Sequence, residues 1–122
     1  MKSIPHIIMG FLWQRDEASA YLYKFFGEID VTDNGTFTGY VKDELGNATI
    51  KGKIQNSLLE FTKEYYPESR GGSREQIFYT LHAQAYDDAK KIICGGWKGV
   101  YIINSGHPDD NGKASCMIYP RL

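Results

Sequence analysis

Apolar and polar residues alternate along most of the chain, which is the pattern of strands with one buried and one exposed face. Helical periodicity is nearly absent. The alternation predicts eight strands, at residues 7–14, 21–31, 36–43, 48–55, 58–65, 76–84, 90–102 and 113–119. Turn-forming residues such as Asp33-Asn34-Gly35 and Asn56-Ser57 separate most of these strands. The sequence therefore predicts an all-β fold.

Three turns define the pairing between residues 21 and 65, because directly opposed residues point to the same face. A three-residue loop that ends with a left-handed Gly35 predicts the pairs Val31–Phe37, Ile29–Gly39 and Gly27–Val41. A four-residue loop over residues 44–47 predicts the pairs Val41–Ile50, Gly39–Gly52 and Phe37–Ile54. A two-residue turn at Asn56-Ser57 predicts the pairs Ile54–Leu59, Gly52–Phe61, Ile50–Lys63 and Ala48–Tyr65. All three turns give one continuous apolar face.

The opposite face of these strands is polar, and we expect it in solvent, with Lys51, Lys53 and Glu60 among its residues. The inner face carries three glycines, which indicate tight coiling of the sheet: Gly27, Gly39 and Gly52, the last covered by Phe61. Strong coiling of about eight strands favours closure, because closure removes exposed edges. We predict one domain over residues 1–122, an antiparallel up-and-down meander closed or nearly closed into a barrel. A two-sheet β-sandwich is the alternative.

Composition narrows the classes of partner. The chain of 122 residues is 42% hydrophobic and 14% aromatic, which fits one globular domain rich in residues that strands favour. A formal charge of −1 and a longest basic run of only Lys90-Lys91 predict no nucleic-acid partner. No apolar stretch approaches the length of a membrane span. The sequence does not define an oligomeric state.

The N-terminal segment and the cysteines bear on location. An apolar stretch at Ile7–Trp13 precedes residues 18–20, which imitate a signal cleavage site. Against a signal peptide, Pro5 and His6 cut short a run that is already brief, and residues 14–17 are unusually charged for a cleavage region. We therefore expect a cytoplasmic protein, with secretion as the alternative. Cys94 and Cys116 are expected to be small buried hydrophobes, and a single bridge between neighbouring strands is the other interpretation.

Three segments resemble small bacterial lipocalin-like barrels of the wider calycin superfamily, which includes lipocalins, fatty-acid-binding proteins and avidins. They are residues 37–52 (FTGYVKDELGNATIKG), 59–65 (LEFTKEY) and 93–97 (ICGGW), and the likeness extends over residues 25–101. Lipocalins have Gly-x-Trp in the first strand, whereas here Gly10 and Trp13 lie one residue further apart. The resemblance implies a barrel able to enclose a small ligand, and it implies no catalytic residue.

Lys63 is unusual because the predicted register turns it inward, between Phe61 and Tyr65 along its strand. A buried ammonium group requires an acidic partner, a hydrated cavity or an anionic ligand. One hypothesis is that Lys63 neutralises the carboxylate or phosphate of a ligand inside the barrel. The other is a lysine at the rim that lays its stem over aromatic rings and keeps its amine in water.

Four aromatic residues share this interior if the strands continue in phase, so the candidate ligand-binding residues are Lys63, Tyr65, Phe61, Tyr79 and Trp97. The alternative is that these rings simply fill the core. Trp97 faces inward only if residues 93, 95 and 97, and not residues 92, 94 and 96, form the inner set.

Catalytic and metal-binding motifs are not recognisable. The histidines, His6, His82 and His107, do not converge, and no nucleophile–base order or phosphate loop is present. We therefore predict no catalytic residue, no metal and no cofactor. Three hypotheses remain: a barrel that binds a small amphipathic or anionic ligand in its interior, a filled barrel that acts as a protein-interaction module through its outer surface, and an enzyme on a lipocalin-like scaffold.

Overall fold

The computed structural model describes residues 2–14, 22–66, 76–87, 89, 92–93, 96–103 and 112–121. These residues form ten strands: β1 (Ser3–Gln14), β2 (Leu22–Thr32), β3 (Thr36–Asp43), β4 (Gly46–Gln55), β5 (Leu58–Tyr65), β6 (Gln76–Ala83), β7 (Tyr86–Asp87), β8 (Ile92–Ile93), β9 (Trp97–Ile103) and β10 (Gly112–Pro120). No helix among the described residues is long and apolar enough to cross a membrane.

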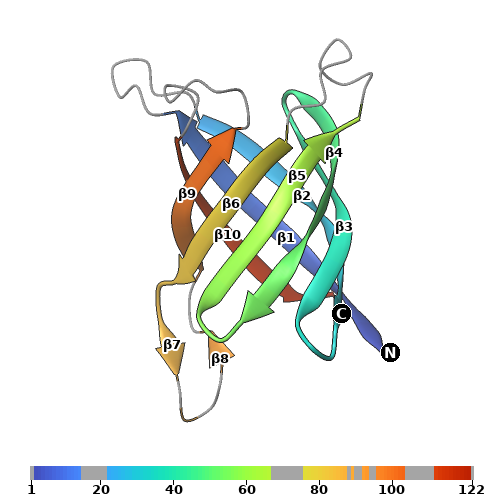
Figure 1. Ribbon diagram of the computed structural model, residues 1–122, viewed down its shortest axis with the longest axis vertical. Helices are drawn as coiled ribbons and strands as arrows, with labels where there is room; N and C mark the ends of the chain where they lie inside the picture. The colour runs from blue at the N-terminus through green and yellow to red at the C-terminus, as the bar shows by residue number, and fades with distance from the viewer. Residues whose placement is uncertain are drawn as a thin grey trace.

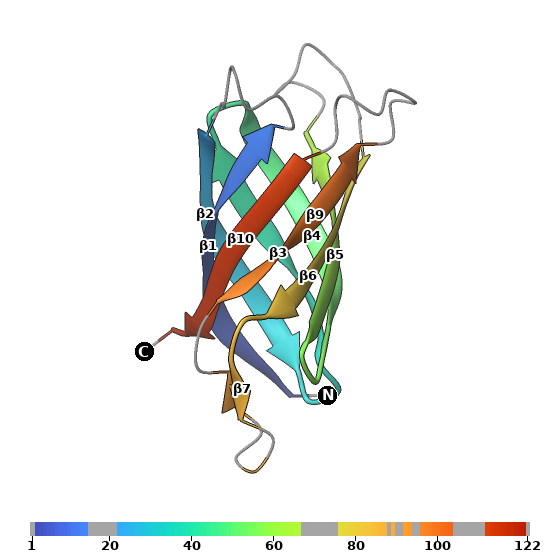
Figure 2. The same ribbon diagram turned by 90° about the vertical axis from the view of Figure 1, so that its left-hand side faces the viewer.

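Eight of the strands form one closed barrel in the order β1-β10-β9-β6-β5-β4-β3-β2, and every neighbouring pair is antiparallel (Figure 1). β1 closes the barrel because it pairs with β2 along one side and with β10 along the other. The predicted closed meander is confirmed, and the sandwich alternative is wrong. The β3–β4 turn lies at one end of the barrel, and the β7–β8 hairpin projects from the other end (Figures 1 and 2).

The predicted strand over residues 90–102 is wrong, because only its second half belongs to the barrel. Ile92–Ile93 pairs with Tyr86–Asp87 in a separate two-stranded sheet, and β9 begins at Trp97. The backbone amide of Gln84 donates to the carbonyl of Gly96 at 2.9 Å, which brings both ends of this hairpin back to the barrel. Glycine weakens a strand and often marks a bend, and Gly96 precedes β9 where the chain re-enters the barrel.

The predicted register is confirmed for β2–β3 and for β4–β5, including the pairs Gly52–Phe61 and Ile54–Leu59. Gly35 has the expected positive φ, at 87°. The β3–β4 register is wrong by two residues, and the observed pairs are Val41–Ala48, Gly39–Ile50 and Phe37–Gly52. The loop holds two residues instead of four, since Asp43 already opposes Gly46. A shift of two residues preserves the face to which each side chain points.

The barrel core contains buried hydrophobic residues from all eight barrel strands: Ile8, Leu12, Phe25, Ile29, Phe37, Val41, Ala48, Ile50, Leu59, Phe61, Tyr65, Ile77, Tyr79, Leu81, Trp97, Tyr101, Ala114 and Cys116. The outer face is exposed at Lys51, Lys53 and Glu60, as predicted. Only two buried residues among those described are charged, Asp43 and Lys63, and both lie on the inner face of the barrel.

Candidate functional sites: a buried polar cluster and an outer apolar groove

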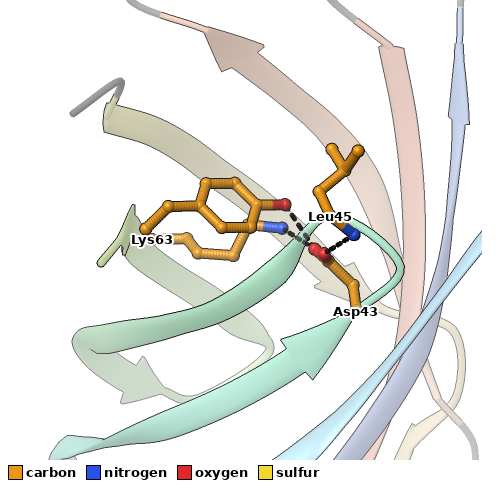
Figure 3. A network of polar contacts seen from close by, with 4 residues as sticks. Asp43, Leu45 and Lys63 are labelled. Atoms are coloured by element: carbon orange, nitrogen blue, oxygen red, sulfur yellow. Dashed lines mark hydrogen bonds and ion pairs between the residues drawn. The ribbon is translucent and has the colours of Figure 1, made fainter. Parts of the chain in front are cut away.

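Lys63 lies inside the barrel and forms an ion pair with Asp43 (Figure 3). The Lys63 Nζ lies 3.0 Å from the Asp43 Oδ2, and each side chain is only 1% exposed. The hypothesis of a rim lysine with its amine in water is therefore wrong. The structure instead shows the acidic partner that a buried ammonium group requires.

Asp43 is the centre of the cluster, because its carboxylate accepts three hydrogen bonds. Oδ2 accepts from the Lys63 ammonium and from the Tyr65 hydroxyl, and Oδ1 accepts from the Leu45 backbone amide at 2.8 Å (Figure 3). The bond to Leu45 lies within the β3–β4 turn, where a side-chain oxygen of Asp commonly stabilises the backbone. One carboxylate therefore ties the tight turn to the polar core.

The sheet register explains how Asp43 reaches β5 across the intervening strand. On β4, Gly46 lies opposite Asp43, and Ala48 lies opposite Tyr65. Both β4 residues are small, so the inner face is open between the two strands at this level. Asp43 was not predicted from the sequence, although it shares the inward parity of Phe37 and Val41 along the same strand.

Aromatic rings surround the Lys63 ammonium. Its Nζ lies 4.8 Å from the centre of the Tyr65 ring, 5.4 Å from that of Tyr79 and 6.0 Å from that of Phe25. Phe61 stacks on Tyr79, with ring centres 4.4 Å apart. The structure therefore brings together four of the five predicted residues. Phe25 was missed, and the signal for it was its inward alternation with Gly27 on the same strand.

Trp97 also faces inward, but it lies at another level of the barrel, opposite Ala83 on β6 and Cys116 on β10. Its Nε1 and the Tyr79 Oη are buried without a hydrogen-bond partner among the described residues. Burial, and then the neighbouring Tyr65 and Asp43, raise the pKa of Tyr79 well above 10. The Tyr79 hydroxyl is therefore neutral and able to donate. Two unpartnered donors inside a barrel are typical of a place for water or for a ligand acceptor.

Cys116 is buried with a free thiol, as expected of a small hydrophobe, and Cys94 lies outside the described residues. His82 is exposed on the outer face and His6 is half-buried, while His107 also lies outside the described residues. Within the described ranges, no group of three His, Cys, Asp or Glu side chains is placed to hold a metal ion.

Burial of Cys116 predicts a loss of stability at alkaline pH. Desolvation raises the pKa of this thiol from 9.0 to about 12. As the pH rises, the unfolded chain therefore loses the thiol proton before the folded chain does. The folded state has its full stability below pH 9, and the free energy of unfolding falls as the pH rises towards 12. We expect the free energy of unfolding to fall with pH by up to about 1.4 kcal/mol per pH unit more in the wild type than in Cys116→Ala. Urea unfolding between pH 7 and pH 11 measures this, and parallel curves for both proteins would contradict it.

A second feature lies on the outside of the barrel, where a groove of about 420 Å³ crosses β2, β1 and β10 and reaches the start of β9. Its exposed apolar side chains are Phe26, Met117, Met9 and Phe11, whose exposed fractions run from 60% to 39%. Monomeric domains rarely expose large contiguous apolar surface, and such a patch usually marks a binding site.

Two parallel rows of outward-facing residues line the groove, and its floor includes the buried residues Gly10, Phe25, Trp97 and Cys116 between them. In one row, Met9 is opposed by Phe26 on β2 and by Met117 on β10. In the other, Phe11 lies between Lys24 on β2 and Ser115 on β10, and Lys98 on β9 follows Ser115. Ser115 and Gly96 are small, so they form a low part of the surface between the larger side chains.

Positive charge borders the groove. Lys24 and Lys98 lie at its two ends, and Lys42 lies opposite Phe26 on β3. The acid Glu28, which shares the outer face of β2 with Phe26, pairs with Arg121 at 2.5 Å. Among the described residues around the groove, the exposed charges available to a partner are therefore those of the lysines.

This groove was not predicted from the sequence. Its signal was the stretch of residues 7–13, in which apolar side chains occupy consecutive positions and not alternate ones. A strand of this kind has two apolar faces, of which the barrel interior buries one.

Comparison of the chain with protein-family models, with curated proteins and with solved structures gives no match. The candidate sites therefore rest on this chain's own residues. They are a neutralised polar cluster inside the barrel and an apolar groove bordered by lysines outside it.

Proposed function

We propose that the barrel is a protein-interaction module that binds an acidic partner through the outer groove of β2, β1 and β10. The groove itself carries the proposal, because its exposed Phe and Met side chains are of the types enriched in protein interfaces. Two of the chain's three methionines line it, and methionine adapts its shape to a partner surface.

The ion pair in the core supports this choice over an anionic ligand in the interior. Lys63 and Asp43 neutralise each other within 3.0 Å. An anion that entered the described interior would meet a positive charge already balanced by a carboxylate. The outer lysines are not neutralised by Glu28, because Glu28 forms an ion pair with Arg121. An acidic partner therefore finds complementary charge outside the barrel.

Barrel closure determines how a partner can bind. Because every barrel strand has a neighbour on both sides, the barrel has no edge strand, and among the described residues near the groove only a short stretch of β10 after Cys116 lacks a second partner strand. Recognition over the whole groove therefore relies mainly on side chains of the outer face. A second copy of this chain fits poorly, since a symmetric contact over the groove would bring Lys24 and Lys98 close to equivalent lysines.

The test is selection of binding peptides from a random display library, followed by mapping of the bound peptides with amide chemical shifts. We expect selected peptides to shift resonances of β1, β2 and β10. Phe26→Ser should weaken their binding about tenfold or more, as for a central interface residue. Phe78→Ser is the matched control, since Phe78 is 42% exposed on the outer face of β6 away from the groove. Peptides that map to another face, or equal loss in both variants, would overturn the proposal.

A second candidate function rests on the unpartnered Tyr79 hydroxyl and Trp97 indole inside the barrel. We propose as the alternative that they donate to a small ligand with a hydrogen-bond acceptor, in keeping with the resemblance to lipocalin-like barrels. Native mass spectrometry of the purified protein tests it. A co-purified molecule lost in Tyr79→Phe but kept in Phe26→Ser supports this alternative, and a bare protein mass counts against it. The cytoplasmic location and the lack of a nucleic-acid partner stay predictions from the sequence.

A further inference from the structure

We infer that the segment bound in the groove is an acidic amphipathic α-helix that lies across the strands, with a carboxylate near each end. This inference rests on the proposed interaction function and specifies the partner's chemistry. It follows from the spacing of the lysines, the shape of the apolar surface and the closure of the barrel.

The spacing comes from the row Lys24, Phe11, Ser115, Lys98, which crosses the neighbouring strands β2, β1, β10 and β9. Neighbouring strands lie about 4.8 Å apart, so three steps separate the two lysine backbones by about 14 Å. An α-helix rises 1.5 Å and turns about 100° per residue, so two carboxylates that face the same surface over roughly this distance are about eleven residues, or three turns, apart.

The apolar surface lies between and beside the two lysines. Phe11 belongs to the lysine row, and Phe26, Met9 and Met117 form the parallel row beside it. A groove of about 420 Å³ accommodates a few side chains, such as those that a helix projects at positions i, i+4 and i+7. Acids at i−3 and i+8, about eleven residues apart, lie at the two ends of these apolar positions and on the same side of the helix.

A helix suits this surface better than an extended segment. The closed barrel has no edge strand, and the few residues of β10 after Cys116 are too short a stretch to pair with an extended segment across the groove. A helix satisfies its own backbone and needs only side-chain contacts. The positive border selects for acid, because Lys24, Lys42 and Lys98 surround the groove while Glu28 is paired with Arg121.

The experiment compares three designed peptides by fluorescence anisotropy with the full chain. The first is helical, with Leu at i, i+4 and i+7 and with Glu at i−3 and i+8, eleven residues apart. The second replaces both Glu by Lys, and the third differs from the first only by a central Pro, which breaks the helix. We expect the first to bind at least about tenfold more tightly than the others, and more weakly as salt rises.

Charge reversal on the barrel tests the same contact from the other side. In Lys24→Glu/Lys98→Glu, the preference should reverse in favour of the Lys peptide. Lys51→Glu/Lys53→Glu is the control, because these exposed lysines lie on β4, away from the groove. The control should keep the wild-type preference.

The outcomes separate this inference from the proposed function. If the three peptides bind alike while library-selected peptides still map to the groove, the acidic helix is wrong and the interaction function stands. If neither the designed nor the selected peptides perturb the groove, both are wrong. If vesicles of phosphatidylglycerol bind the protein through Lys24 and Lys98 while the helices do not, the surface binds membranes and the inference is overturned.

Discussion

Lys63→Met is expected to lower the free energy of unfolding by about 3–5 kcal/mol with no ligand present, the usual cost of breaking a buried ion pair from one side. The methionine would fill most of the volume of the lysine stem, so the loss would come from charge. The Asp43 carboxylate would stay buried at 1% side-chain exposure without its cation. Urea unfolding at neutral pH measures the effect.

Two further variants identify the cause. Asp43→Asn/Lys63→Met removes both charges, while the new amide oxygen still accepts from the Leu45 amide. We expect this double variant to recover most of the stability lost in Lys63→Met, because neutral replacement of a buried pair is often nearly neutral in free energy. Lys53→Met on the exposed face should change stability by less than about 0.5 kcal/mol. A change below about 1 kcal/mol in Lys63→Met would contradict the buried pair.

This result also bears on function. A large loss of stability without ligand marks Lys63 as part of the fold. The outer lysines, Lys24 and Lys98, would then be the charges available to a partner. The inner charges of the barrel are neutralised in an ion pair, while Phe26 and Met117 are exposed outside. This arrangement favours binding through the outer surface.

The inner face of residues 21–65 could be predicted because strand parity depends on short turns and not on distant contacts. The β3–β4 loop shows how robust this is. The true loop is two residues shorter than the predicted one, yet Phe37, Gly39 and Val41 keep their inward direction. The buried acid was missed because Asp43 is the last residue of its strand, where an aspartate usually belongs to a turn. In the structure it serves both the turn and the core.

The outer groove could not be predicted from local pattern, because it depends on barrel closure. Met9 meets Met117 only where β1 pairs with β10, and these strands lie at opposite ends of the sequence. Turn chemistry sets the register between consecutive strands, but nothing in the sequence sets it between the first and the last. Local pattern is also insufficient for the strand predicted over 90–102, which was wrong. Its apolar residues continue through the β7–β8 hairpin, which lies outside the barrel sheet.

Gly39→Ala is the second substitution expected to have a large effect. Gly39 opposes Ile29 on β2, where the two backbones approach closely. A Cβ at Gly39 would lie 2.0 Å from the Glu28 carbonyl oxygen and 2.7 Å from the Ile29 Cα. Both are backbone atoms, so no side chain can move aside to relieve the contact. Nearby on the same strand pair, a Cβ at Gly27 would lie 1.8 Å from the Tyr40 carbonyl oxygen.

One methyl group at Gly39 must therefore push β2 and β3 apart where the barrel coils tightly. Loss of the close approach between these two backbones affects closure of the whole sheet. We expect Gly39→Ala to lower the free energy of unfolding by about 3 kcal/mol, at the upper end of the cost of overpacking. The neighbouring Thr38→Ala, at an exposed position, should change it by less than about 0.5 kcal/mol. Urea unfolding compares them, and circular dichroism shows whether Gly39→Ala folds at all. Equal stabilities would mean that β2 and β3 lie further apart and that coiling at these glycines does not close the barrel.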